Sequence, residues 1–232
     1  MKIIIATIKS YNIENALKLR ERYPTHQIDV ITSKFGLTEE KLRTLEPDYI
    51  FFPHWSWIIP ENIYKRYRCI VFHTADLPYG RGGSPIQNLI IRGIYKTKIS
   101  AIEVVEEIDA GDIYLKEDID LEAGNIDEII KCISDKIFNN MIPEFLKREL
   151  KPYKQEGKIL EFKRRKPEES NFYNFLTEKN DIDDKKIYDF IRMLDGEGYP
   201  KAYLEIGKYK MELKNIKLEV DGLSGEFKIK RK

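Results

Sequence analysis

His73 is the residue whose type and position first suggest chemistry. It ends the apolar run Cys69–Phe72, and the loop after it, Thr74–Pro85, holds three glycines, two prolines, an arginine and an aspartate. Glycine-rich backbone can approach a ligand closely, and the loop opens a helical pattern whose first N–H groups favour anions. The segment therefore indicates a ligand site, although its composition also fits a histidine at the end of a strand beside an ordinary turn.

A second loop supplies acidic side chains that could assist this histidine. The loop, Glu106–Asp112, carries four acids. A histidine that acts as a base near pH 7 needs a carboxylate partner, which fixes its tautomer and raises its basicity. Spacing alone does not say which of the four acids reaches His73, and a solvated turn is the alternative for most of them.

The elements that must position these loops form an alternating pattern. Short apolar or alternating runs that are typical of strands cover Lys2–Ala6, Gln27–Thr32, Asp48–Phe52, Cys69–His73, Lys98–Glu107 and Asp112–Leu121. Helical spacings cover Asn12–Tyr23, Thr38–Leu45, Pro60–Tyr67, Pro85–Gly93 and Asn125–Leu150. Strands that alternate with helices favour βαβ units. We therefore predict an α/β fold with a Rossmann-like, mainly parallel sheet and helices on both faces.

The chain changes character after the long helix expected over Asn125–Leu150. A charged stretch, Glu156–Glu169, is followed by a polar one, Asn171–Asp184, which shows no strong periodicity. A short helix over Lys185–Leu194 then leads to three strand-like runs, at Ala202–Ile206, Lys208–Leu218 and Gly225–Ile229. These patterns predict a first domain over residues 1–155 and a small, strand-rich C-terminal domain over residues 156–232.

Composition excludes several classes of protein. The 232 residues carry 40 Lys and Arg against 39 Asp and Glu, and this net charge of +1 argues against nucleic acid as a partner. The two cysteines, Cys69 and Cys132, and the three widely spaced histidines argue against a metal site. No apolar stretch approaches the roughly 20 residues that span a bilayer, and the N-terminus shows no signal pattern. We therefore expect no membrane partner and a cytoplasmic location.

The segment that begins at His73 resembles a known family. The sequence HTADLPYGRGGSPIQ is similar to the H-x-S-L-L-P-x-x-R-G-x-x-P-x-Q segment of the folate-dependent formyltransferases. That family includes methionyl-tRNA formyltransferase, glycinamide ribonucleotide formyltransferase and the sugar N-formyltransferases. Trp55–Pro60 resembles the family's Y-G-x-I-L-P segment, and the interval from His73 to Asp109 matches the family's histidine-to-aspartate spacing. Phe162–Pro167 and Ile191–Ala202 look like the start of the family's C-terminal domain, so the resemblance covers nearly the whole chain.

The resemblance implies an enzyme that transfers one-carbon groups, with 10-formyltetrahydrofolate as co-substrate and no metal. His73 would be the base that takes the proton of an acceptor amine, and Asp109 would orient it. The residues that the resemblance assigns to the folate are Trp55, Trp57, Ile58, Pro60, Ile108 and Asp109. Those that it places beside the acceptor are Arg81, Gly82, Gly83 and Gln87. Arg81 either contacts the acceptor or braces the loop, and we favour the bracing role.

One position departs from the family pattern. The family carries an asparagine two residues before the histidine, whose amide donates to the formyl oxygen, whereas this chain has Val71. Losing one donor of this kind costs on the order of 100- to 1000-fold in rate. His54, Gln87 and Asn88 are candidates for a replacement donor; the other readings are a slow enzyme or a protein that binds without transferring. The family's usual serine two residues after the histidine is also replaced, by Ala75.

The acceptor is chosen by elimination within the family. The tRNA enzymes of the family carry a longer C-terminal domain, so a C-terminal region of about 70 residues and a near-neutral charge argue against tRNA. The glycinamide ribonucleotide enzymes of the family have a Gly/Ser-rich loop after the first strand, and Thr7–Asn12 lacks glycine, which argues against that acceptor. These arguments leave a nucleotide-linked amino sugar, and the resemblance then implies a homodimer through the C-terminal domain. The alternatives are a methionyl-tRNA formyltransferase-like enzyme, a formyltetrahydrofolate hydrolase and a non-catalytic homologue.

Overall fold

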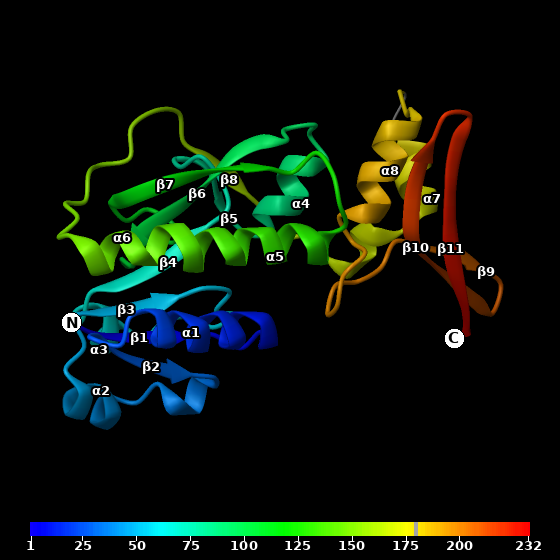
Figure 1. Ribbon diagram of the computed structural model, residues 1–232. Helices are drawn as coiled ribbons and strands as arrows, with labels where there is room; N and C mark the ends of the chain where they lie inside the picture. Colours follow the sequence, from blue (N-terminus) through cyan, green and yellow to red (C-terminus); the bar gives the residue numbers. More distant parts are fainter. Residues whose placement is uncertain (179–180) are drawn as a thin grey trace. The chain divides into compact units, whose positions relative to one another are not determined.

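The main sheet of the protein contains the strand that ends at His73. The computed structural model describes residues 1–178 and 181–232, and within them this sheet has the strand order β2-β1-β3-β4-β6-β7 (Figure 1). Its strands are β1 (Lys2–Ala6), β2 (Gln27–Ile31), β3 (Tyr49–Phe52), β4 (Cys69–His73), β6 (Lys96–Glu103) and β7 (Ile113–Asp120). β1 pairs in parallel with β2 and β3, and β3 pairs in parallel with β4, whereas β6 is antiparallel to β4. The mainly parallel sheet is therefore confirmed.

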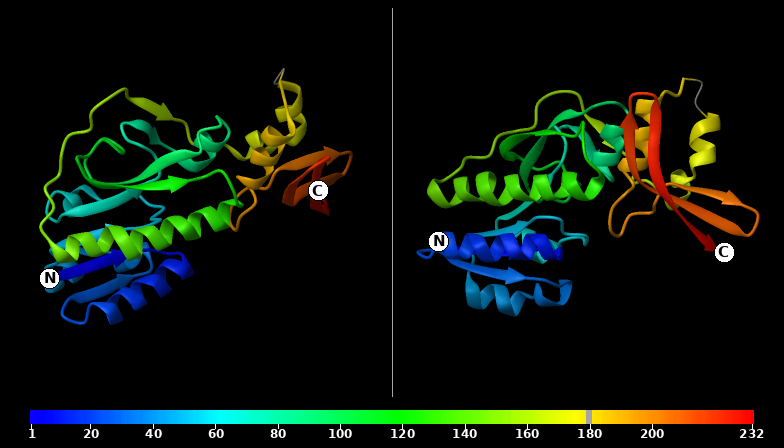
Figure 2. Two further views of the ribbon diagram at one scale, coloured as in Figure 1. Left: turned by 45° about the horizontal axis from the view of Figure 1, so that its top comes forward. Right: turned by 45° about the vertical axis from the view of Figure 1, so that its right-hand side comes forward.

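Helices cover both faces of this sheet, as the alternating pattern predicts. Along this part of the chain the helices are α1 (Ser10–Arg22), α2 (Glu39–Leu45), α3 (Glu61–Tyr64), α4 (Pro85–Ile90), α5 (Ile126–Lys136) and α6 (Ile142–Lys147), of which α4 belongs to a second compact unit. Successive strand residues point to opposite faces, so β3 contributes to two cores. Phe52 joins an apolar cluster with Leu42 of α2 and Ile63 of α3, while Phe51 contacts Phe145 of α6, with ring centroids 5.0 Å apart. Figure 2 shows α1 beside the run from α5 to α6.

The long helix expected over Asn125–Leu150 contains a wider turn. A π-helical segment, Ile137–Met141, separates α5 from α6, and the helix ends at Lys147. Pro143 lies within this run and has no N–H to donate, and its ring crowds the carbonyl four residues earlier, so the regular ladder gives way locally. The predicted start is confirmed, since the Glu128 N–H donates to Asn125 Oδ1 at 3.0 Å.

The C-terminal part of the chain is rich in strands, as predicted, but it also contains a helix that periodicity does not reveal. Its elements are α7 (Phe172–Glu178), α8 (Asp184–Arg192), β9 (Tyr203–Ile206), β10 (Tyr209–Glu219) and β11 (Gly222–Arg231). β10 pairs in antiparallel fashion with both β9 and β11. The ring of Phe175 stacks on Phe190 of α8 with centroids 4.1 Å apart, so α7 is stabilised by tertiary packing.

Smaller elements complete the description. β5 (Tyr79–Gly82) and β8 (Leu160–Phe162) form a two-stranded sheet, and 3-10 turns cover Lys34–Gly36 and Pro167–Ser170. Neither β5 nor β8 is predicted from the sequence. β5 lies in the glycine-rich loop, and β8 pairs only with β5. None of the helices in the described part of the chain has the length and apolar character that spanning a bilayer requires.

The chain divides into two compact units that are not continuous in sequence. The first comprises Met1–Gly82, Thr97–Ile119 and Lys131–Glu161, and the second comprises Gly83–Lys96, Asp120–Ile130 and Phe162–Lys232. His73 and Asp109 belong to the first unit. The domain boundary between residues 155 and 156 stays a prediction.

Candidate active site

His73 is held at the carboxyl end of β4. In the antiparallel pairing with β6 it lies opposite Ser100, whose hydroxyl donates to the carbonyl of Ala75 at 2.8 Å. This bond fixes the chain directly after the histidine. The side chain of His73 is buried, with 8% of its surface exposed.

Both ring nitrogens of His73 face acceptors. Nδ1 lies 3.3 Å from Asp109 Oδ2, and Nε2 lies 2.7 Å from the carbonyl oxygen of Gly80. A neutral imidazole carries one proton, so only a ring protonated on both nitrogens donates to both partners. The sequence left four acids as possible partners of the histidine, and the structure brings Asp109 to it.

Asp109 sits in a tight turn whose backbone has little freedom. Its φ is 55°, in the left-handed region that non-glycine residues rarely adopt. The N–H of Gly82 donates to its Oδ2 at 2.9 Å. A Cβ on Gly111 would lie 1.8 Å from the carbonyl oxygen of Glu103, so the turn passes directly over the end of β6.

Arg81 braces the two loops in this structure. Its Nε and one terminal nitrogen donate to Gln155 Oε1 at 3.1 and 3.0 Å, and its other terminal nitrogen contacts Glu107 at 2.9 Å. The amide nitrogen of Gln155 in turn donates to the carbonyls of Asp109 and Gly111, both at 2.8 Å. Sequence reasoning missed Gln155, because it lies in a charged segment without periodicity.

A cavity of about 450 Å³ lies in the same unit and takes in this turn. All six residues that the resemblance assigns to the folate line it: Trp55, Trp57, Ile58, Pro60, Ile108 and Asp109. Val71, Ile102 and Val104 contribute further apolar wall. An apolar pocket with a few polar groups is the usual form of a small-molecule site.

Two indole rings form part of the cavity wall. The rings of Trp55 and Trp57 meet edge to face with centroids 4.9 Å apart. The Nε1 of Trp55 is buried and has no hydrogen-bond partner among the described residues. A buried indole N–H usually has an acceptor, so this atom is an exception within the described part of the chain.

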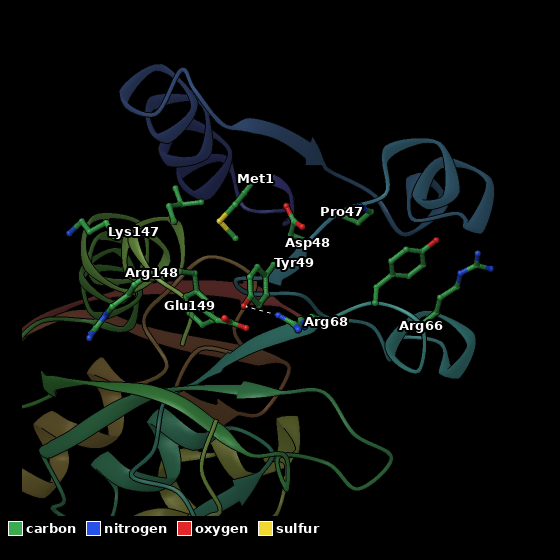
Figure 3. Close-up of a pocket in the computed structure, with 12 residues that line it drawn as sticks. Met1, Pro47, Asp48, Tyr49, Arg66, Arg68, Lys147, Arg148 and Glu149 are labelled. Atoms are coloured by element: carbon green, nitrogen blue, oxygen red, sulfur yellow. Dashed lines mark hydrogen bonds between the residues drawn. The ribbon is translucent and has the colours of Figure 1, made fainter. Parts of the chain in front are cut away.

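A larger cavity, of about 540 Å³, lies at the opposite, amino end of the strands. It is lined by Tyr49 at the start of β3 and by Arg68, which precedes β4. Figure 3 shows the side chain of Arg66 on one side of the view and those of Lys147 and Arg148 on the other. This cavity lies at the amino end of the strands, whereas His73 is at the carboxyl end of β4.

Two predicted acceptor residues, Gly83 and Gln87, belong to the second unit and make contacts there. A Cβ on Gly83 would lie 2.6 Å from the Cα of Arg164, and Gln87 Nε2 donates to the carbonyl of Met193 at 3.4 Å. Asn88 donates to the carbonyls of Gly83 and Lys163, each at 3.0 Å. The amides of Gln87 and Asn88, both candidates for the missing donor, are thus used within this unit.

His54, the third candidate donor, follows β3 in the first unit. Asn12 Nδ2 lies 3.1 Å from its Nδ1, so Nδ1 accepts and the ring proton lies on Nε2. Burial, followed by the charge of Lys9, lowers the pKa of His54 from 6.5 to about 4. The ring is therefore a neutral donor through Nε2 at ordinary pH.

Comparisons with known proteins identify similar proteins over both parts of the chain. A family model described as formyl transferase matches residues 36–136, and one described as methionyl-tRNA formyltransferase, C-terminal domain, matches residues 167–230. A methionyl-tRNA formyltransferase from Bacillus cereus (strain B4264) is 30% identical over 174 residues, covering 71% of this chain and 52% of that protein. The chain thus spans about half the length of the curated relatives that it matches.

Solved structures extend the similarity over the whole chain. A sugar N-formyltransferase from Shewanella is similar at a TM-score of 0.62 and 16% identity over 100% of this chain and 96% of that one, a likeness that shows the fold alone. A methionyl-tRNA formyltransferase from Clostridium thermocellum superposes with a TM-score of 0.93 and is 50% identical over 100% of both chains. Identity at that level along the full length, together with the two matching models, shows that the chain belongs to the formyltransferase family.

Proposed function

We propose that the protein is an N-formyltransferase that moves the formyl group of 10-formyltetrahydrofolate to an amine. The observation that carries this proposal is the cavity lined by all six predicted folate residues, one of which, Asp109, also contacts Nδ1 of His73 at 3.3 Å. A histidine oriented by a carboxylate beside an apolar pocket is suited to proton transfer during acyl transfer.

The chemistry is attack of the amine nitrogen on the formyl carbon. A bond forms between these atoms, and the bond from the formyl carbon to N10 of the folate then breaks. The amine loses one proton and N10 gains one. Nε2 of His73 carries this proton in the proposal; its neighbour in the structure is the carbonyl oxygen of Gly80, 2.7 Å away. Asp109 stabilises the imidazolium that forms.

The acceptor in this proposal is the amine of a nucleotide-linked amino sugar. Three lysines of the C-terminal sheet form ion pairs: Lys214 with Glu226, Lys230 with Glu212, and Lys232 with Glu205, at 2.6 to 2.9 Å. RNA binding relies on cations that neutralise phosphates, and paired lysines are less available for it. Methionyl-tRNA is the second candidate, because the Clostridium protein that shares 50% identity bears that name.

One experiment tests the donor and the acceptor together. The protein is incubated with 10-formyltetrahydrofolate and, separately, with a panel of nucleotide-linked amino sugars, with methionyl-tRNA and with buffer alone, and the products are read by mass spectrometry. We expect formylated amino sugar, and a rate about 100- to 10,000-fold lower in His73→Ala. His26→Ala is the matched control, because His26 contacts only the N-terminal region.

The remaining outcomes separate the alternatives. Formyl-methionyl-tRNA as the product would replace the sugar by tRNA, and release of formate in buffer alone would make the protein a hydrolase. Folate binding without turnover in any arm would identify a non-catalytic homologue.

A further inference from the structure

Gln155 uses its whole side-chain amide to join two loops of the first unit. Its nitrogen donates one proton each to the carbonyls of Asp109 and Gly111, and its oxygen accepts two bonds from Arg81. In the flipped orientation the amide nitrogen would face the Arg81 donors and the amide oxygen would face the two carbonyl oxygens. The partners therefore fix the orientation of the amide. The residues on either side, Lys154 and Glu156, are exposed, whereas Gln155 is half-buried.

These bonds close a ring that includes the carboxylate of Asp109. The ring runs from Gln155 to the Asp109 backbone, through the Asp109 carboxylate to the N–H of Gly82, and from the neighbouring Arg81 back to Gln155. The same carboxylate oxygen is 3.3 Å from Nδ1 of His73. Gln155 therefore holds both the turn that carries the carboxylate and the strand that donates to it.

Among the described residues Arg81 has one other polar partner, Glu107, which is a weaker anchor. Its contact to Glu107 joins a side chain that is 10% exposed to one that is 71% exposed. Exposed ion pairs contribute little, because solvent and salt screen them. The guanidinium is therefore held chiefly through Gln155.

We propose that Gln155 is a positioning residue of the active site, which keeps Asp109 in its left-handed turn and its carboxylate on His73. This inference rests on the proposed function, in which His73 carries the proton. A neutral amide suits the position because it must donate to two carbonyls and accept from a cation. Gln155→Glu keeps the size and the contact to Arg81 but loses both donors to the turn.

The test combines three variants with a readout that needs no substrate. Gln155→Glu, Gln155→Asn and Gln155→Ala are compared with Gln27→Ala, a matched glutamine whose amide contacts only Asp29. The ¹⁵N shifts of the His73 ring report its contact with Asp109 without any turnover. We expect these shifts to change in all three Gln155 variants. We also expect kcat to fall about 10- to 100-fold, with a smaller rise in KM for the folate, because Asp109 also lines the cavity.

The outcomes distinguish this inference from the proposed function. Unchanged His73 shifts in Gln155→Glu would overturn the positioning role, whether or not an acceptor is found. A parallel loss of folate binding and thermal stability, with an unchanged histidine spectrum, would also overturn it, since a merely structural residue behaves in that way. Changed shifts in a protein without transferase activity would support the positioning role and reject the function.

Discussion

His54 shows how one neighbour fixes the chemistry of a ring. Its φ is 53°, a rare value for a non-glycine residue, and Asn12 donates to its Nδ1. Asn12 is itself buried and accepts from the hydroxyl of Ser134 at 2.5 Å. The amide orientation is therefore set from both sides, and the imidazole keeps its proton on Nε2.

The lowered pKa of His54 predicts a slope of stability with pH. The unfolded chain takes up a proton at 6.5, whereas the folded chain does so only at about 4. The unfolded state thus binds more protons in this window, so stability falls as the pH falls from 6.5 through 4, by on the order of 3 kcal/mol. Urea unfolding across this range should show the slope in the original protein and lose it in His54→Gln. His26→Gln is the control that should retain it.

Val71 raises the question of which group stabilises the formyl oxygen. Its side chain packs with Leu77, Ile102 and Ile113 and offers no donor. Of the three candidate donors, His54 is the one in the first unit, and its Nε2–H is a neutral donor. We predict that His54→Phe lowers kcat about 100-fold while the folate dissociation constant stays within a few-fold.

A second variant makes this prediction sharp. Adding Val71→Asn to His54→Phe should restore much of the lost kcat, because the amide enters the position that the family uses. Single-turnover kinetics would measure both effects. A His54→Phe protein with unchanged kcat would show that the ring does not serve the formyl oxygen.

At the scale of elements, the turn that carries Asp109 is packed tightly against the end of β6. Gly111 has no room for a side chain, because its Cβ would lie 1.8 Å from the carbonyl oxygen of Glu103. We predict that Gly111→Ala lowers the free energy of unfolding by about 3 kcal/mol and weakens folate binding, since Asp109 must shift. Gly93→Ala is the control: its φ is 70° and nothing lies within 4 Å, so the cost should be about 1 kcal/mol and folate binding should be unchanged. Folate affinity is measured by titration and stability by thermal unfolding. Equal losses of both in Gly111→Ala and Gly93→Ala would contradict this account.

The elements that the sequence predicts well are those with strong local signals. β1 and β4 have the predicted bounds, and Thr38 caps α2 by accepting from the Lys41 N–H, as its type suggests. β5 and α7 were missed because each depends on a distant partner. β5 is glycine-rich backbone that pairs with β8, and α7 is stabilised by the stacking of Phe175 on Phe190. The π-helical segment before Pro143 is likewise a response to one residue inside an otherwise regular pattern.

The candidate site divides in the same way. His73 was singled out from the loop that follows it, whereas Asp109 and the cavity residues came from the resemblance to the formyltransferases. Gln155 was not, because its role depends on a long-range contact, 46 residues from Asp109 and 74 from Arg81. The acceptor residues Gly83 and Gln87 stay predictions, since the structure describes their contacts within the second unit only.

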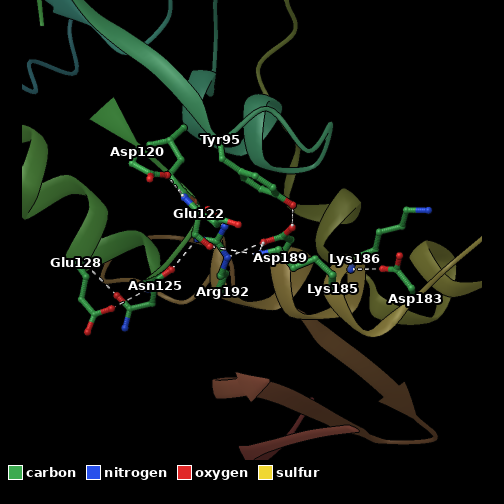
Figure 4. A network of polar contacts seen from close by, with 12 residues as sticks. Tyr95, Asp120, Glu122, Asn125, Glu128, Asp183, Lys185, Lys186, Asp189 and Arg192 are labelled. Atoms are coloured by element: carbon green, nitrogen blue, oxygen red, sulfur yellow. Dashed lines mark hydrogen bonds and ion pairs between the residues drawn. The ribbon is translucent and has the colours of Figure 1, made fainter. Parts of the chain in front are cut away.

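At the scale of the whole molecule, the second unit has its own buried polar centre. Arg192 is 1% exposed and donates to Asp189 at 2.7 Å and to the carbonyls of Leu121 and Gly124 (Figure 4). Asp189 also accepts from the hydroxyl of Tyr95 at 2.5 Å, and burial, followed by this bond, raises the pKa of Tyr95. These contacts join three segments that are far apart in sequence. A homodimer through the C-terminal domain stays a prediction.

Removing the cation from this centre leaves the Asp189 charge buried without its main partner, a change that typically costs 3–5 kcal/mol. We therefore predict that Arg192→Leu lowers the free energy of unfolding of the second unit by about 4 kcal/mol. Arg43→Leu is the matched control, because Arg43 pairs with Glu39 on an exposed helix surface, at 59% and 39% exposure, and should change stability by about 0.5 kcal/mol or less.

The readouts are calorimetry and folate titration on the same samples. If the two units unfold separately, Arg192→Leu should shift one transition and leave the other, which folate stabilises by mass action, in place. Folate affinity should then be unchanged, because the cavity and the His73–Asp109 pair lie wholly in the first unit. A single transition that shifts as a whole in Arg192→Leu would instead show that the two units unfold as one cooperative body, and that the buried centre of one supports the active site of the other.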